Sequence, residues 1–308
     1  METKRLEYFL RIVDCGSISR AAQDLGLAQP ALSQQLAILE GELKVQLMYR
    51  SRRGTTPTAA GWQLYQRARI FLRQLEQTRA SLLEADDQLS GSVSIGLPTS
   101  TATIISVPLM QRVLARYPQI RLHVIEGYSS MLTEMTQSGR LDVAVLFFNS
   151  QMSGLSIEPL WEEELLLVCP PDTQQTGPVP LRMLADVPLL LPSKANSSRR
   201  SLDAALAANR MGVVPIAEID SIVTLKKAVQ DRFAYTLLPW SAISEEVESG
   251  RLTACAIEGA PVSRTVSLCF PDAVHRTPAH EKIAEIIREQ SDIAFESRRL
   301  VGMRRIAA

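Results

Sequence analysis

One stretch, from Cys15 to Leu43, constrains this chain more than any other, because it predicts two short helices joined by a tight turn. Ser17 stands where an N-cap belongs, Gly26 interrupts the helical pattern, and Pro30 suits the first turn of a second helix. Each half has an apolar face at helical spacing, formed by Ile18, Ala21, Ala22 and Leu25 and then by Leu32, Leu36, Leu39 and Leu43.

The opposite face of the second helix is polar, small and uncharged, with Gln29, Ser33, Gln34 and Ala37 along it. Such a face fits the major groove of DNA, where Gln and Ser can form hydrogen bonds to base edges. The alternative is a two-helix hairpin in a helical bundle, with this face simply exposed to solvent.

A basic segment follows the two helices, although the whole chain is neutral, with 33 basic and 33 acidic residues. Between Lys44 and Arg79 eight basic residues stand against one acidic residue, a net charge of +7. Two β-prone ends flank a basic tip within residues 47–57, which predicts the wing of a winged helix. Its arginines would contact phosphates or the minor groove, or else form a solvated basic hairpin: Arg50, Arg52 and Arg53.

The sequence of residues 16–43, GSISRAAQDLGLAQPALSQQLAILEGEL, resembles the N-terminal signature of the LysR-type transcriptional regulators. Within that family it is most similar to the nitrogen-assimilation-control branch. Residues 47–61 resemble the wing that follows it. The resemblance implies a DNA-binding regulator and not an enzyme, and the charged N-terminus without an apolar leader predicts the cytoplasm. It implies DNA contacts by Ser17, Arg20, Gln29, Pro30, Ala31, Ser33, Gln34, Arg50, Arg52, Arg53 and Thr58.

A long helix, capped by Thr58 and ending near Asp87, is predicted next. Its apolar residues fall at heptad spacing: Leu64, Ala68, Phe71, Leu75 and Leu82. This seam predicts pairing with the same helix of a second subunit; the alternative is a surface helix packed on its own domain. We therefore expect a winged helix-turn-helix domain (1–58), and a linker helix and hinge (59–90).

From Val93 onward strands alternate with helices, which predicts an α/β domain (91–308) with a parallel sheet and right-handed crossovers. The pattern divides into two sub-domains, the first about 91–162 and 266–295, the second about 163–265. Two such sub-domains with a cleft between them resemble periplasmic binding proteins. The basic C-terminal end is predicted to be a mobile, solvated tail: Arg298, Arg299, Arg304 and Arg305.

Hydroxyl side chains follow several predicted strands, where ligands of open α/β sheets bind and where helix N-termini favour an anion. The family resemblance implies an effector in the cleft between the sub-domains, contacted by Thr99, Ser100, Thr101, Tyr128, Ser129, Ser197 and Ser221. The expected effector is a small organic anion or an amino-acid-like metabolite. Arg199 and Arg200 could neutralise a carboxylate, and for any single hydroxyl helix capping is the alternative.

The sequence gives little support for a catalytic, metal-binding or redox function. Catalytic motifs such as GxSxG, a P-loop, GxGxxG or HExxH are absent, and the four cysteines lack metal-ligand spacing. We expect no cofactor, no metal, no membrane span and no redox-active cysteine. The expected partners are double-stranded promoter DNA, further copies of the chain in a dimer or tetramer, and RNA polymerase. Two alternatives stay open: a regulator without a ligand, and a solute-binding module.

Overall fold

The computed structural model describes residues 2–51, 54–83, 89–148, 151–174, 177–259, 262–272, 274–296 and 301–306. Contacts between Cα atoms divide the chain into two compact units. The first comprises the N-terminal residues through Asp87 with short segments at 138–140 and 273–275, and the second comprises the remainder. Each unit has hydrophobic cores of its own.

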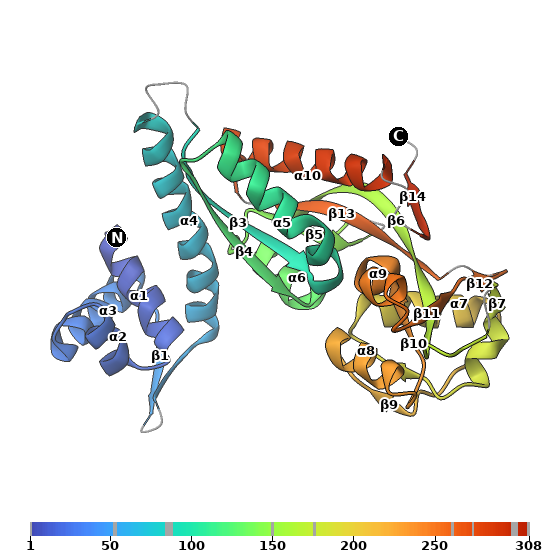
Figure 1. Cartoon of the computed structure of the whole chain (residues 1–308). Coiled ribbons are helices and arrows are strands. Elements are labelled where there is room, and N and C mark those ends of the chain that lie inside the picture. Colours follow the sequence, from blue (N-terminus) through green and yellow to red (C-terminus); the bar gives the residue numbers. More distant parts are fainter. Residues whose placement is uncertain are drawn as a thin grey trace. The chain divides into compact units, whose positions relative to one another are not determined.

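The first unit contains three packed helices followed by a β-hairpin (Figure 1). Its first element is α1 (Thr3–Cys15), and the predicted helices and wing follow as α2 (Ile18–Asp24), α3 (Gln29–Leu43), β1 (Met48–Ser51) and β2 (Gly54–Pro57). The apolar stripes of the helices meet in one core, where Phe9 and Leu32 have no exposed surface. Leu43, predicted to close the buried stripe, is instead 37% exposed, because α3 ends there and Lys44 turns the chain in a left-handed conformation.

Helix α4 (Ala59–Leu83) has 25 residues and is about 37 Å long at 1.5 Å per residue. Its first turns pack onto the domain's own core, where Ala68 is buried, so the first positions of the predicted seam serve that core. Phe71, further along, is 49% exposed. The side chain of Leu82 and the predicted helix end near Asp87 lie outside the described residues.

The second unit begins with the predicted parallel sheet. Its strands are β3 (Gly91–Pro98), β4 (Ile120–Gly127) and β5 (Val143–Phe147), connected by α5 (Thr99–Arg116) and α6 (Ser129–Gln137). Helix α5 and the C-terminal helix α10 (Pro278–Glu296) cover one face of this sheet, and α6 covers the other (Figure 1). We call this part the first lobe.

Two long antiparallel strands, β6 (Leu155–Cys169) and β13 (Ser263–Pro271), pass from the first lobe into the second. Trp161 of β6 packs in the core of the first lobe, whereas Leu165, four residues later, packs in a core of the second. The two lobes are therefore connected by a continuous two-stranded ribbon.

The second lobe is built on the far half of β6. Antiparallel to it run β10 (Thr236–Pro239) and β11 (Thr253–Cys255), and β8 (Leu190–Leu191) pairs with β9 (Ala217–Glu218) and β7 (Val179–Pro180) with β12 (Ile257–Glu258). The helical elements are η1 (Leu181–Ala185), α7 (Ser197–Ala208), α8 (Ile222–Gln230) and α9 (Trp240–Glu248). The α9 helix was not predicted, because Pro239 marked the end of a strand and gave no sign that a helix starts at the next residue.

The prediction of a mobile C-terminal tail is wrong for residues 301–306. Met303–Arg305 form a strand, β14, that pairs antiparallel with β6. Arg304 forms an ion pair with Glu164, and Arg305 lies 3.1 Å from an oxygen of Asp292. Arg298 and Arg299 lie outside the described residues.

Candidate nucleic-acid interface and ligand cavity

The two short helices form the predicted helix-turn-helix geometry. The hydroxyl oxygen of Ser17 accepts a hydrogen bond from the backbone N–H of Arg20 and caps α2 at a distance of 3.4 Å. Gly26 takes a left-handed conformation in the turn, with φ of +67°, which is easiest for glycine. The polar face of α3 is open to solvent, with four exposed residues, Gln29, Pro30, Ala31 and Gln34, and a half-buried Ser33.

The β1–β2 hairpin lies beside this face. Arg50 is directly opposite Thr55 in the hairpin, and its Nη1 donates to the Oγ of Ser33 at 3.2 Å. The guanidinium is exposed and links the wing to α3. Arg52 and Arg53, predicted to contact DNA from the tip, lie outside the described residues.

Two other predicted DNA-contacting residues have internal hydrogen bonds. The exposed Arg20 donates to the backbone carbonyl of Cys15. Thr58 is buried; its hydroxyl donates to the carbonyl of Gln46 at 2.8 Å and accepts from the N–H of Gly61 at 2.9 Å. Thr58 therefore caps α4 and joins it to the start of the wing.

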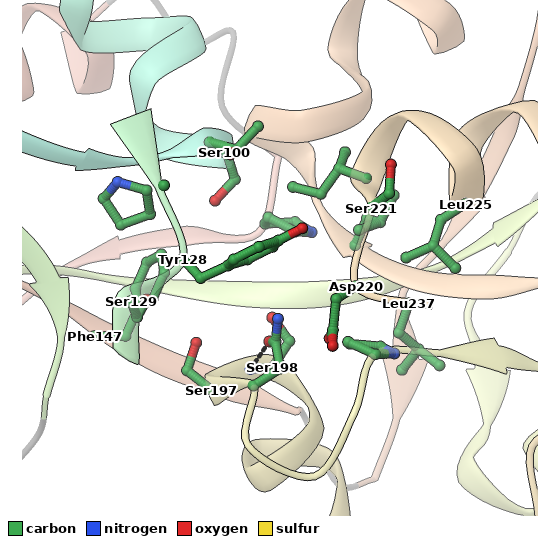
Figure 2. A pocket seen from close by; sticks show the side chains of 18 of the residues that line it. Ser100, Tyr128, Ser129, Phe147, Ser197, Ser198, Asp220, Ser221, Leu225 and Leu237 are labelled. Atoms are coloured by element: carbon green, nitrogen blue, oxygen red, sulfur yellow. Dashed lines mark hydrogen bonds between the residues drawn. The ribbon is translucent and has the colours of Figure 1, made fainter. Parts of the chain in front are cut away.

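A cavity of about 290 Å³ lies in the second unit, lined by residues of both lobes (Figure 2). Volumes near this value are at the lower end of the range for small-molecule sites. The carboxyl ends of β3 and β4 and the N-termini of α7 and α8 meet at it. Among the predicted effector contacts, those that line it are Thr99, Ser100, Tyr128, Ser129, Ser197 and Ser221.

Thr101 does not line the cavity. It is a buried residue of α5, and its hydroxyl oxygen has no hydrogen-bond partner among the described residues. Successive residues of an α-helix point about 100° apart. Ser100 therefore faces the cavity, while Thr101, the next residue, faces the interior.

The floor of the cavity holds a buried ion pair that was not predicted from the sequence. Arg264 on β13 and Glu163 on β6 are direct partners in the strand pairing, and Arg264 Nε lies 2.6 Å from Glu163 Oε1. Only 6% and 2% of the two side chains are exposed. The guanidinium also stacks on Phe147, 3.5 Å from the ring centroid.

Arg264 connects the two lobes through its remaining hydrogen bonds. Its Nη2 donates to the hydroxyl of Ser100 at 2.9 Å, and its Nη1 donates to that of Ser198 at 2.8 Å. Ser100 lies in the first turn of α5 in the first lobe, and Ser198 lies in the first turn of α7 in the second. Burial lowers the pKa of the Arg264 guanidinium, and the Glu163 carboxylate opposes that shift. Arginine keeps its charge even so, because its ordinary pKa is far above neutrality.

The prediction that Arg199 or Arg200 neutralises a bound carboxylate is not supported. Arg199 is buried, and it donates to Asp203 at 2.9 Å and to Glu218 at 3.0 Å. Arg200 donates to the backbone carbonyl of Ala195. Neither side chain lines the cavity.

The cysteines are poorly suited to redox chemistry in the folded chain. Burial raises the pKa of Cys169 and of Cys269 to about 12, and it also raises that of Cys255. Thiolates are the reactive species, so these thiols are expected to be inert. In the part of the chain that the structure describes, no group of three or more His, Cys, Asp or Glu could hold a metal ion. No described helix is long and apolar enough to cross a membrane.

A second group of buried polar side chains lies in the first lobe, and its hydrogen bonds fit a structural role. Asp142 accepts from both the N–H and the hydroxyl of Ser94, at 2.8 and 3.0 Å, and lies 3.4 Å from His280 Nε2. The other ring nitrogen of His280 accepts from the backbone N–H of Thr277 at 3.2 Å. This geometry fits a neutral imidazole that donates to a buried carboxylate.

Comparison with known proteins accounts for nearly the whole chain. Residues 3–62 match the bacterial regulatory helix-turn-helix family of lysR type, and residues 86–292 match the LysR substrate binding domain. The nitrogen assimilation regulatory protein nac of Escherichia coli is 38% identical over 288 residues, covering 93% of this chain and 94% of the relative.

Two solved structures share the fold. A full-length OxyR from Pseudomonas aeruginosa matches with a TM-score of 0.75 and 19% identity, over 100% of this chain and 99% of that one. The full-length regulator CbnR, solved in complex with its target DNA, matches with a TM-score of 0.64 and 21% identity, over 94% of this chain and 100% of that one.

Proposed function

Because this chain belongs to the LysR family of DNA-binding transcription regulators, which are not enzymes, we propose that it reads a promoter sequence under the control of a small molecule. One observation carries the proposal: a helix with an exposed polar face, in a winged helix-turn-helix, occurs in the same chain as a cavity lined by two lobes. The chain then divides into a DNA-binding domain (1–58), a linker (59–90) and a regulatory domain (91–308). Within the regulatory domain, the chain enters the second lobe near residue 163 and returns to the first near residue 265.

In the proposed complex α3 enters the major groove, and Gln29, Ser33 and Gln34 form hydrogen bonds to base edges. Gln29 and Gln34 are exposed on one face with the half-buried Ser33 beside them, which supports this role. Arg50 contacts a phosphate beside that groove, together with the wing-tip residues Arg52 and Arg53. Pro30 and Ala31 pack closely against the DNA at the helix start. Ser17, Arg20 and Thr58 hold the helices and the wing in position.

Gln34→Ala tests the base contact. A good bidentate contact contributes about 1–3 kcal/mol of discrimination, so the variant should lose roughly tenfold or more in preference for the cognate promoter over random duplex. Gln63→Ala, which removes another exposed glutamine in the same unit, is the control. Equal weakening on both duplexes would contradict direct readout by Gln34. Arg50→Ala should weaken binding to both duplexes and reduce the slope of log K against log salt concentration by about one.

The effector binds in the cavity and is a small organic anion or an amino-acid-like molecule. Binding favours one angle between the lobes by twisting the β6–β13 ribbon. Such a ligand shifts the population only if it binds the two arrangements with different affinity. The altered arrangement changes the spacing of DNA-binding domains in a tetramer built as two dimers, and with it the contact to RNA polymerase. The exposed Trp62 and Phe71 on α4 support pairing of linker helices between subunits.

A thermal-shift screen of the full chain, repeated with Ser100→Ala, tests the effector. A ligand at 100 times its dissociation constant should stabilise the folded protein by about 2.7 kcal/mol. A hit that is lost in Ser100→Ala supports binding in the cavity. One observation favours the second candidate, a regulator without ligand: Arg264 already bonds the hydroxyls of Ser100 and Ser198. The absence of any hit would favour that candidate.

A further inference from the structure

The charge of the cavity wall is informative about what binds there. Three of its lining residues are formally charged: Glu126, Asp220 and Arg264. The positive charge of Arg264 is compensated by Glu163, its partner on the neighbouring strand β6. Two carboxylates therefore remain uncompensated, and the wall as a whole is negative.

The carboxylate of Asp220 is held in position on the second lobe. It lies just before α8, and its Oδ1 accepts from the backbone N–H of Ser193 at 2.9 Å. Figure 2 shows the side chain extending from the segment before α8 toward the side of the cavity where Ser198 lies, away from Tyr128. No hydrogen bond to Oδ2 and no ion pair of Asp220 occurs among the described residues.

The second carboxylate comes from the first lobe. Glu126 is the penultimate residue of β4, lines the same cavity and is exposed. Within the described part of the chain it has no ion-pair partner either. One carboxylate from each lobe thus borders the cavity, and a cation held between them would be attracted to both.

The floor of the cavity offers hydrogen-bond donors. The hydroxyl oxygens of Ser100 and Ser198 accept from Arg264, so the hydroxyl hydrogens are available to donate elsewhere. They can donate to a carboxylate or carbonyl oxygen of a ligand. Apolar lining is supplied by Phe147, Leu225 and Leu237.

From this arrangement we infer that the effector carries a protonated amine, bound by Asp220 and Glu126, and an oxygen acceptor that meets Ser100 and Ser198. Amino acids and their close derivatives have this chemistry, whereas di- and tricarboxylates lack the cation. The inference rests on the proposed effector control and narrows it to nitrogen-containing ligands. An anion without an amine would gain the hydroxyl donors and the helix N-termini, but it would face two carboxylates that no cation balances.

The test uses the full chain and a panel of matched trios. Each trio contains an amino acid, the amine without its carboxylate and the acid without its amine, for example L-leucine, 3-methylbutylamine and 4-methylpentanoate. Binding is measured by thermal shift and then by titration calorimetry. We expect a binder among the amino acids or amines, with the matching acid at least tenfold weaker.

Variants assign the binding to the cavity. Asp220→Asn should raise the dissociation constant of the amine-containing ligand at least tenfold, and it should improve binding of the matching acid. Asp186→Asn removes an exposed carboxylate that does not line the cavity, and it should leave both constants unchanged.

Two results would overturn the inference, and they differ in what they mean for the proposed function. An acid that binds as tightly as its amino acid, and is lost in Ser100→Ala, leaves effector control standing but refutes the amine. Absence of binding by every member of the panel contradicts the amine and favours the regulator that acts without a ligand.

Discussion

The ion pair at the floor of the cavity gives the sharpest test of how this regulatory domain is held together. Arg264→Met removes the guanidinium and leaves Glu163 buried, with 2% of its side chain exposed and its main partner gone. Removing one member of a buried pair typically costs about 3–5 kcal/mol of folding free energy, because the remaining charge is desolvated without compensation. We expect a loss of that size.

The double variant separates this penalty from the net contribution of the pair. Arg264→Met with Glu163→Leu replaces both charged groups by apolar side chains, and such replacements are often neutral or stabilising. The hydroxyls of Ser100 and Ser198 lose a donor, but they border the cavity, where water can replace it. We therefore expect the double variant to recover most of the loss, within about 1–2 kcal/mol of the parent chain.

The assay is chemical and thermal unfolding of the full chain, followed by a probe in the regulatory domain. The coupling free energy from the double-mutant cycle should be of the order of 3 kcal/mol. If the two single losses simply add in the double variant, the two groups act independently. The reasoning would also be refuted if Arg264→Met alone cost less than about 1 kcal/mol, because the pair would then be effectively solvated.

Three further predictions concern separate parts of the molecule. Gly61→Ala should destabilise the N-terminal unit by about 3 kcal/mol or more, measured by thermal unfolding, because a Cβ there would lie 2.0 Å from the carbonyl oxygen of Leu47; normal stability would mean that the wing can shift. Asp142→Ala should lower the free energy of unfolding by about 3 kcal/mol or more, because it leaves the buried donors around it without an acceptor. Asp186→Ala, at an exposed position, should lower it by less than about 0.5 kcal/mol. Similar losses in the two variants would contradict this account. At pH 8 a thiol reagent should label one cysteine of the native chain, and it should label all four cysteines only after unfolding. Rapid labelling of more than one cysteine in the native chain would contradict the raised thiol pKa values. Because the folded-state pKa values are raised, the thiol contribution to stability is present below pH 9 and lost as the pH rises toward 12, by up to about 1.4 kcal/mol per pH unit for each of Cys169 and Cys269.

The elements of the N-terminal unit were predictable because their signals are local. A cap at Ser17, a proline at the start of α3 and apolar spacing within single helices fix where each helix begins and which face is buried. Local spacing does not say which neighbour covers a face. For that reason the apolar positions early in α4 were assigned to a second subunit, whereas Ala68 packs inside its own domain.

The cavity was predictable in outline for a topological reason. Strand ends of an open α/β sheet meet at one edge, so hydroxyls at those ends were expected to gather there. The ion pair was not predictable in the same way, because Glu163 and Arg264 are 101 residues apart and meet only through the register of two long strands. Glu163 lies in the middle of β6 and Arg264 near the start of β13, so the pattern of neither strand marks the two residues as partners.

The strand formed by Met303–Arg305 has a practical consequence. It covers the backbone of β6 on the side away from β13, near Trp161 and Glu163. Deleting these residues would leave free N–H and C=O groups on a short stretch of β6, but that stretch carries Glu162 and Glu163, and charged side chains on an edge strand oppose pairing with other chains. Removal of the strand should therefore leave the protein soluble, and its main cost should be the loss of the ion pairs that Arg304 and Arg305 form with Glu164 and Asp292.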